Sequence, residues 1–297
     1  MSADSDDRPN ALINFMFSKM PVRGALVQLD SQWRELAGQH DYVPIVSSLL
    51  GQSIAASAMM ASTMKFEGML TLQLTGAGSL GMLIAQCNQS LHVRGMAGEL
   101  DLDTAHDSFA ALAGAGRLTL TVDAKDAKDR YQGIIEVRPE SLAATLGAYY
   151  LESAQLAAHF VLLADAQNLC GVMLQRLPDA DGLDDDDWRR LCLMADTLTL
   201  DEMRAGAGIT MLSKLFAEDD VIAYEHQDVV FRCRCSDERA EAAVRMLGEA
   251  DARQLLEERD QQIEIVCEFC NAKRILDPVD VARLFNPASM ASDAGLQ

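Results

Sequence analysis

The sequence predicts an α+β fold made of three parts, and three observations support this prediction. Segments with strand patterns follow one another between residues 10 and 178, with helical segments at irregular intervals. This order favours α+β over the regular alternation of a βαβ fold. Pro178–Asp187 then holds six aspartates in ten residues together with a glycine, which is the composition of a solvated linker. Four of the seven cysteines lie in the last quarter of the chain, where they indicate a separate small module.

The first part, residues 10–178, is expected to be a mixed α/β domain with β-sheets. Val22–Leu29 has the composition of a strand, and residues 43–65, rich in Ala, Ser and Met, that of a helix. Met69–Thr75 alternates apolar and polar side chains with the period of two of a half-buried strand. Further strands are expected at Met82–Cys87, Leu91–Met96, Leu118–Val122 and Ile134–Val137. Residues 141–163 return to helical spacing.

The second part, residues 179–220, is expected to be an acidic linker that carries two amphipathic helices. Trp188–Leu198 follows a block of aspartates, whose negative charges stabilise the positive end of a helix. Asp201–Phe216 follows Thr199-Leu-Asp-Glu202, the pattern of a capping box. A short helical segment is therefore expected to connect the two ends of the protein.

The third part, residues 221–290, contains the clustered cysteines. Cys233 and Cys235 form a C-x-C pair, and Cys267 and Cys270 form a C-x-x-C pair. Two such pairs joined by a longer segment can supply four thiolates to a tetrahedral Zn²⁺ ion. We therefore expect these cysteines to bind one Zn²⁺ per chain, in place of a large core, so that folding of this part depends on the metal. Its expected elements are the strands Val221–Tyr224 and Val229–Cys233 and the helix Ser236–Leu247.

The surroundings of the cysteines bear on how the site responds to oxidants. Each pair is short enough to close as a local disulfide once the metal is lost, and this oxidation is reversible. Basic side chains favour the thiolate over the thiol, and five of them flank the cysteines: Arg232, Arg234, Arg239, Lys273 and Arg274. The spacing alone nevertheless favours a permanent structural zinc site over a redox switch.

Charge and composition narrow the possible partners. The formal net charge is −20, from 45 acidic and 25 basic residues, which argues against a nucleic-acid surface. Residues 1–7 are acidic and polar, unlike a secretory signal, and no uninterrupted apolar segment of about 18 residues indicates a membrane span. An odd number of cysteines, without disulfide-type spacing before residue 230, fits a reducing compartment. We expect a cytoplasmic protein that binds neither nucleic acid nor membrane.

The remaining motifs do not indicate an enzyme. The sequence has no paired-histidine metal motif, Gly-x-Ser-x-Gly elbow or Walker loop. Gly76–Gly81 matches G-x-G-x-x-G, but the segment after it is too short and too apolar for the helix of a dinucleotide site, so a turn between two strands is expected. Cys87, Cys170 and Cys192 lie in apolar contexts and are expected to be buried.

Motifs along nearly the whole chain match those of one protein family. Near the C-terminus they are Phe231–Arg239, Leu247-Gly248 and Cys267–Cys270. In the first part they are Val22–Gly24, Lys65–Gly68, Leu72–Gly78, Val93–Gly95, Tyr131–Gly133 and Leu174–Pro178. These motifs resemble the zinc motif and the N-terminal domain of the Hsp33 family of redox-regulated chaperones. Arg274 and Leu276 depart from the resemblance, because aromatic residues are expected there in the family's C-terminal strand.

The resemblance implies a holdase that binds unfolding client proteins without ATP, with an inactive zinc-bound form and an active oxidised form. We expect oxidation to join Cys233 to Cys235 and Cys267 to Cys270, to release zinc, and to unfold the C-terminal module. The linker helices then become mobile. Clients bind to these helices and to the face of the N-terminal domain that the helices and the module had covered. The resemblance also implies a homodimer in the active form. The side chains expected to meet clients are apolar ones of the linker: Leu191, Leu193, Met194, Leu198, Met203, Ile209, Met211, Leu212, Leu215 and Phe216.

Two functions from other classes remain open at this stage. A zinc ribbon could recruit nucleic acid or a protein partner, although the negative charge opposes nucleic acid. Cys267-Glu-Phe-Cys270 could serve a thiol oxidoreductase, which requires the pair at the start of a helix in a thioredoxin-like fold. Catalytic turnover of a disulfide substrate would support the oxidoreductase, and stoichiometric suppression of aggregation would support the chaperone.

Overall fold

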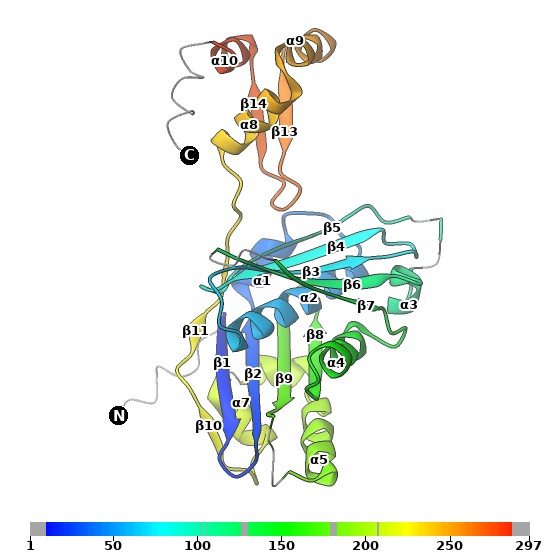
Figure 1. Ribbon diagram of the computed structural model, residues 1–297, viewed down its shortest axis with the longest axis vertical. Helices are drawn as coiled ribbons and strands as arrows, with labels where there is room; N and C mark the ends of the chain where they lie inside the picture. The colour runs from blue at the N-terminus through cyan, green and yellow to red at the C-terminus, as the bar shows by residue number, and fades with distance from the viewer. Residues whose placement is uncertain are drawn as a thin grey trace. The chain divides into compact units, whose positions relative to one another are not determined.

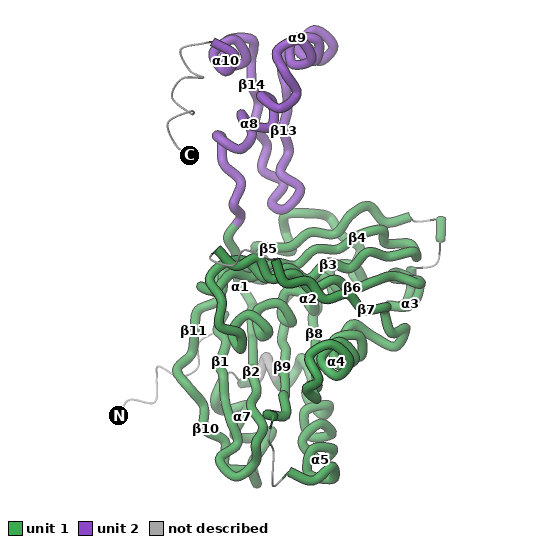
Figure 2. Tube along the Cα trace, viewed as in Figure 1, with its two compact units in different colours: residues 1–232 green, residues 233–297 purple. Residues whose placement is uncertain are grey.

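The computed structural model describes residues 10–286 except 102, 105, 126–129, 179–182 and 207. The chain forms two compact units, residues 1–232 and residues 233–297 (Figure 2). The strands expected near Val221 and Val229 belong to the first unit, because they pair with its strands. Both cysteine pairs lie in the second unit.

Two six-stranded sheets form the framework of the first unit (Figure 1). The first has the order β10-β1-β2-β9-β8, with β11 beside β1, and consists of β1 (Ala11–Phe17), β2 (Val22–Leu29), β8 (Ala158–Ala164), β9 (Leu169–Arg176), β10 (Val221–Ala223) and β11 (Gln227–Asp228). The second has the order β12-β5-β4-β3-β6-β7, and consists of β3 (Gly68–Thr75), β4 (Met82–Asn88), β5 (His92–Ala97), β6 (Arg117–Ala124), β7 (Tyr131–Glu136) and β12 (Val230–Phe231). Neighbouring strands are antiparallel except β12 and β5. This pairing confirms the predicted α+β class.

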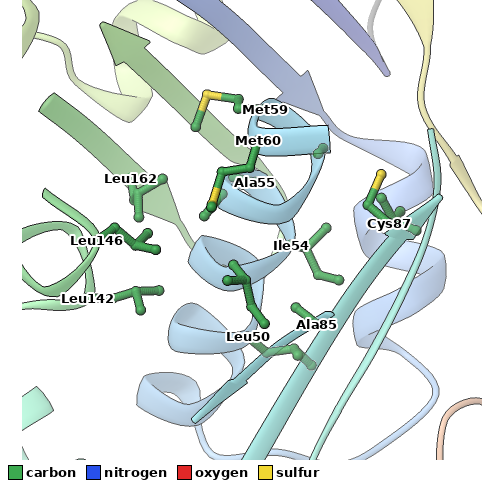
Figure 3. Close-up of a cluster of buried hydrophobic side chains, with 14 of the residues drawn as sticks. Leu50, Ile54, Ala55, Met59, Met60, Ala85, Cys87, Leu142, Leu146 and Leu162 are labelled. Carbon is green, nitrogen blue, oxygen red and sulfur yellow. The ribbon is translucent and has the colours of Figure 1, made fainter. Parts of the chain in front are cut away.

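Helix α2 (Pro44–Thr63) lies between the two sheets and forms the centre of the core (Figure 3). Its side chains are buried on all sides, and Leu50 and Met59 are completely covered. Both sheets approach it closely at glycines. A Cβ on Gly95 would lie 2.8 Å from Leu50 Cδ1, and one on Gly171 would lie 2.6 Å from Met59 Cε. A larger residue at either position would force the end of the facing α2 side chain to move.

By length and hydropathy alone, α2 could also cross a membrane. However, 72% of its most apolar window is buried inside the protein, so its composition is that of a core helix enclosed by two sheets. Helices α1 (Ser31–Ala37), α3 (Phe109–Ala113) and α4 (Leu142–Ser153) also lie beside the sheets.

The helix expected over residues 141–163 is wrong in its second half. α4 ends at Ser153, and Gln155 has a left-handed backbone conformation (φ 55°) that a right-handed helix does not contain. β8 follows, with Phe160 and Leu162 buried on one face. A short apolar segment has no period that separates helix from strand. This segment forms a strand because it pairs with β9 in antiparallel orientation.

The single helix expected at Asp201–Phe216 is two helices. α6 (Leu200–Ala205) ends at Gly206, and α7 (Gly208–Leu215) begins with Gly208 at a φ of 59°. Two glycines so close together lower the helix propensity enough to break the helix. The capping box is confirmed, since Glu202 N donates to Thr199 Oγ1 at 3.3 Å and Thr199 N donates to the Glu202 carboxylate at 2.9 Å.

The linker helices α5 (Asp185–Asp196) and α7 cover the face of the first sheet opposite α2 (Figure 1). Alternation along β9 shows this division, because successive side chains of a strand point to opposite faces. Leu169 and Met173 belong to the cluster around α2, whereas Cys170, Val172 and Leu174 belong to the cluster with the linker helices. The first sheet is thus apolar on both faces.

Over its described residues, 233–286, the second unit has three helices and one hairpin: α8 (Asp237–Leu247), α9 (Glu249–Glu258), β13 (Ile263–Val266), β14 (Lys273–Leu276) and α10 (Pro278–Leu284). The helix predicted at Ser236–Leu247 is confirmed as α8, and Ser236 is its N-cap, with Ser236 Oγ accepting a hydrogen bond from Arg239 N at 3.3 Å. The buried core is small and aliphatic: Val244, Ala252, Leu256, Ile263, Leu276, Val281 and Leu284. The unit therefore has a core of its own, and the cysteines lie outside it.

Candidate metal centre

Two loops of the second unit bring the four cysteine side chains together. Cys233 and Cys235 precede α8, and Cys267 and Cys270 lie between β13 and β14. The Sγ atoms of Cys233 and Cys267 are 3.6 Å apart, and those of Cys235 and Cys270 are 3.4 Å apart. All four Sγ atoms lie within 4.8 Å of one another. Among the residues that the structure describes, these cysteines form the one His, Cys, Asp or Glu group with this metal-site spacing.

A tight β-hairpin loop holds the C-x-x-C pair. Cys267 N donates to Ala272 O at 3.0 Å, and Asn271 N donates to Cys267 O at 2.8 Å. Asn271 has a left-handed backbone (φ 52°), which asparagine adopts more readily than most residues. Strand pairing ends at Val266 and Lys273, so the pair occupies a hairpin loop and not the start of a helix. This position argues against a thioredoxin-like oxidoreductase.

The sulfur positions fit a tetrahedral metal ion. With Zn–S bonds near 2.3 Å, the edges of a regular tetrahedron of four sulfurs are about 3.8 Å long. The Cys233–Cys267 and Cys235–Cys270 sulfur distances, 3.6 and 3.4 Å, are near this value. All four cysteines are partly exposed, so both a metal ion and a small oxidant have access to them. The cluster can therefore hold a metal ion.

The thiols of this cluster do not ionise equally. Burial raises the pKa of Cys233, but hydrogen bonds from the Cys235 backbone and the neighbouring thiols outweigh burial and lower that pKa to about 7. Burial is the main reason why the pKa values of Cys235 and Cys270 are raised above the ordinary thiol value. Several thiolates this close together repel one another. A bound cation is therefore required for all four to be thiolates at neutral pH.

The other three cysteines are chemically different. Cys87 and Cys170 are completely buried, as predicted, and burial raises the pKa of both thiols. Cys192 on α5 is only half-buried, and burial together with the nearby Asp196 raises its pKa to about 11. These three thiols are protonated at neutral pH and are poor nucleophiles.

The apolar side chains of the linker helices are largely covered in this structure. The residues predicted to meet clients divide as follows: Leu191, Leu198, Met211, Leu212 and Phe216 are buried, Met194, Ile209 and Leu215 are partly buried, and Leu193 is 57% exposed. The side chain of Met203 lies outside the described part of the structure. The linker therefore hides most of the surface that was predicted to bind clients.

Phe216 and an ion pair hold the linker to the sheet. The Phe216 ring lies edge-on to Phe17 with centroids 5.1 Å apart, and its centroid is 6.0 Å from that of Phe15. Arg190 of α5 donates two hydrogen bonds to the Asp219 carboxylate, at 3.0 and 2.8 Å, and the Asp219 side chain is only 7% exposed. These contacts fix α5 and α7 relative to each other and to β1.

Sequence reasoning did not include β1, which supplies the aromatic partners of Phe216. Its signal was available, because Ile13, Phe15 and Phe17 recur with a period of two and all face the linker cluster. The Arg190–Asp219 pair spans 29 residues and left no local signal in the sequence.

Comparison with known proteins identifies the family. The family model described as Hsp33 protein matches residues 10–277. The chain belongs to the Hsp33 family. Two proteins named 33 kDa chaperonin, from Nitrosococcus oceani and Azotobacter vinelandii, are each 39% identical to this Hsp33 chain. The matches cover 92% and 91% of the chain, respectively, and 93% of each relative.

A solved structure agrees with the fold. The crystal structure of the 33 kDa chaperonin from Thermotoga maritima, a heat shock protein 33 homologue, matches with a TM-score of 0.80. The match covers 96% of this Hsp33 chain and 99% of the other at 19% identity, so it shows a shared fold. The family and the names of its members make this protein a chaperone and not an enzyme.

Proposed function

We propose that this member of the Hsp33 family is a cytoplasmic, redox-regulated holdase that works without ATP. Cys233, Cys235, Cys267 and Cys270 bind one Zn²⁺ in the reduced, inactive form. Under oxidative stress the cysteines form disulfides, and apolar surface becomes available to unfolding client proteins. The oxidised form is a homodimer. The convergence of four thiols from two loops within 4.8 Å of one another carries this proposal.

Three parts of the chain divide this work. Residues 10–178 bind clients, residues 179–220 form a metastable linker, and residues 221–290 carry the redox switch, with β10 and β12 attaching this last part to the first unit. The linker contributes its own apolar side chains to client binding, together with the sheet face that it covers. A net charge of −20 helps to keep complexes with unfolded proteins in solution.

The four thiolates stabilise the fold of the C-terminal unit. Below roughly 70 residues a hydrophobic core seldom suffices for a stable domain, and the buried core in the described part of this unit consists of seven aliphatic residues. Zinc, when bound, supplies a cross-link between the loop before α8 and the loop between β13 and β14. The cysteines thereby couple the folding of the unit to its metal content.

Oxidation removes this tie between the loops. Each disulfide forms when two thiolates lose two electrons, and one peroxide molecule takes up these electrons with two protons from the solvent to become two waters. Two peroxides therefore close both disulfides. A disulfide from Cys233 to Cys235, or from Cys267 to Cys270, stays within one loop. Neither bond replaces the cross-link between the loops, so the unit loses the restraint that kept it folded.

The chain itself connects the switch to the linker. Arg232 N donates to Val93 O at 3.0 Å, directly after β12 and directly before Cys233. β10, which follows α7, pairs with β1. These strands are two and three residues long, and such short edge strands open at little cost. Unfolding that begins at Cys233 can therefore spread through β12 and β10 to α7 and uncover the sheet.

Zinc affinity is expected to rise steeply with pH. The pKa values of Cys235 and Cys270 are raised, so at pH 7 both carry protons that a metal must displace. For each proton that zinc displaces, the apparent zinc affinity falls about tenfold when the pH is lowered by one unit. Because at least two protons are displaced, we expect the affinity to fall at least about 100-fold per pH unit near pH 7. Competition with a chelator of known proton affinity, between pH 6.5 and 7.5, measures this slope. A slope of less than one proton would contradict binding by protonated thiols.

One experiment tests the proposed function. Zinc release and aggregation of a heat-unfolding client are followed together, before peroxide treatment with mild heating, after it, and after thiol reduction. We expect no protection by the zinc-loaded protein, stoichiometric protection once zinc is released, and loss of protection on reduction. Full protection by the zinc-loaded protein, with no gain on oxidation, would refute the switch. Catalytic turnover of a disulfide substrate, or salt-sensitive RNA binding, would favour the other two functions.

A further inference from the structure

One of the basic residues that flank the cysteines is turned inward on β14, as the alternation of the strand shows. Arg274 and Leu276 face the interior of the C-terminal unit, with 25% of the Arg274 side chain and 6% of Leu276 exposed. Lys273 and Ile275 face outward, and the Lys273 side chain is 61% exposed and pairs with Glu264 at 3.0 Å. Two adjacent residues with the same charge thus lie on opposite faces of one strand.

The Arg274 side chain joins β14 to the first turn of α8. Its Nε donates to Asp237 Oδ1 at 2.6 Å. Asp237 is the first residue of α8, immediately after the cap that follows Cys235, and Arg274 is the second residue of the strand that follows Cys270. The guanidinium also interacts electrostatically with Cys235 and Cys270. One cation therefore joins the strand after the second pair to the segment after the first pair, and its charge acts on a cysteine of each pair.

We propose that Arg274 is the counter-charge of the four-cysteine site, held in place by Asp237, and that it sets how firmly this chain retains its metal. This inference rests on the proposed zinc binding. Four thiolates around one Zn²⁺ carry a net charge of −2, and a partly buried cation beside them offsets part of it. The Asp237 side chain is 82% exposed, so the ion pair itself adds little to folding stability. Its carboxylate orients the guanidinium.

The test compares reduced full-length variants that differ at two neighbouring positions. Arg274→Gln is expected to weaken zinc binding roughly tenfold, because it removes a charge beside the thiolates. Lys273→Gln removes the same charge from the outer face and is expected to change the affinity by less than about twofold. Arg274→Lys keeps the charge and should recover most of the loss. Competition with a chromophoric chelator measures all three, and the effect of Arg274→Gln should shrink as salt is raised.

A spectroscopic measurement separates a charge effect from a structural one. With Co²⁺ in the site, the sulfur-to-metal charge-transfer band of Arg274→Gln should move to longer wavelength, because the thiolates lose a neighbouring positive charge. The band of Lys273→Gln should stay in place. Equal zinc affinities for Arg274→Gln and Lys273→Gln would overturn this inference but not the proposed function. The same holds if Arg274→Lys binds zinc as weakly as Arg274→Gln and the charge-transfer band of Arg274→Gln does not move. A wild-type protein that binds no zinc would overturn the proposed function and this inference with it.

Discussion

Reduced Cys267→Ser protein is expected to lose stoichiometric zinc binding and to suppress client aggregation without any oxidant. A serine hydroxyl does not ionise at neutral pH and cannot replace a thiolate ligand. Loss of a residue that only hydrogen-bonds to a metal ligand can weaken metal binding roughly 100-fold. Loss of a ligand itself should weaken zinc binding by more than this. The loop between β13 and β14 is then no longer tied to the loop before α8. Zinc content, protease resistance of the C-terminal unit and client aggregation measure the three consequences.

Cys192→Ser is the matched control for this variant. It makes the same chemical change on α5, outside the four-cysteine cluster. We expect this protein to bind one zinc per chain and to stay inactive until it is oxidised. Unchanged zinc stoichiometry and protease resistance in Cys267→Ser would contradict the ligand role of Cys267.

Phe216→Ala is expected to activate the zinc-loaded, reduced protein. Phe216 is 1% exposed and packs against the rings of Phe15 and Phe17. Truncation of a buried phenylalanine to alanine costs about 3–5 kcal/mol, which is comparable to the free energy that holds a local segment in place. The linker helices should therefore leave the sheet while the metal site stays intact. Aggregation suppression and zinc content, measured on the same sample, test this result.

Leu193→Ala provides the comparison on the same linker. Leu193 is 57% exposed on α5, so its truncation removes apolar surface without loosening the helix. This variant should remain inactive in the reduced form. If Phe216→Ala releases the linker helices and keeps its zinc but does not bind clients, the linker is not the cover of the client-binding surface.

Short sequence patterns predicted the strands, helices and cysteine pairs that depend on neighbouring residues in the chain. The alternation of Met69–Thr75 predicted β3, and the apolar helix pattern after residue 43 predicted α2. Gly76 N donates to Gly81 O at 3.0 Å in the connection between β3 and β4, which confirms the turn predicted there in place of a dinucleotide site. The paired cysteines also have a local signal, and the structure brings all four together.

Features that depend on distant contacts could not be predicted in the same way. The sequence around Phe160 and Leu162 follows α4 and was predicted to continue that helix. These residues form a strand because they pair with β9. β10 and β12 lie close to the cysteines in the sequence, yet their partners are β1 and β5, about 200 and 140 residues earlier. The inward orientation of Arg274 likewise follows from the register of β13 and β14, which the sequence did not reveal.

The most direct test of the coupling between switch and linker is amide hydrogen exchange, measured on one sample before and after peroxide treatment. The segments to compare are β13 and β14 in the C-terminal unit, α5 and α7 in the linker, and α2 in the core. We predict that oxidation removes protection from the hairpin and from both linker helices together, while α2 stays protected. Oxidised protein that suppresses aggregation while α5 and α7 keep their full protection would contradict the release of the linker as the step that exposes the client-binding surface.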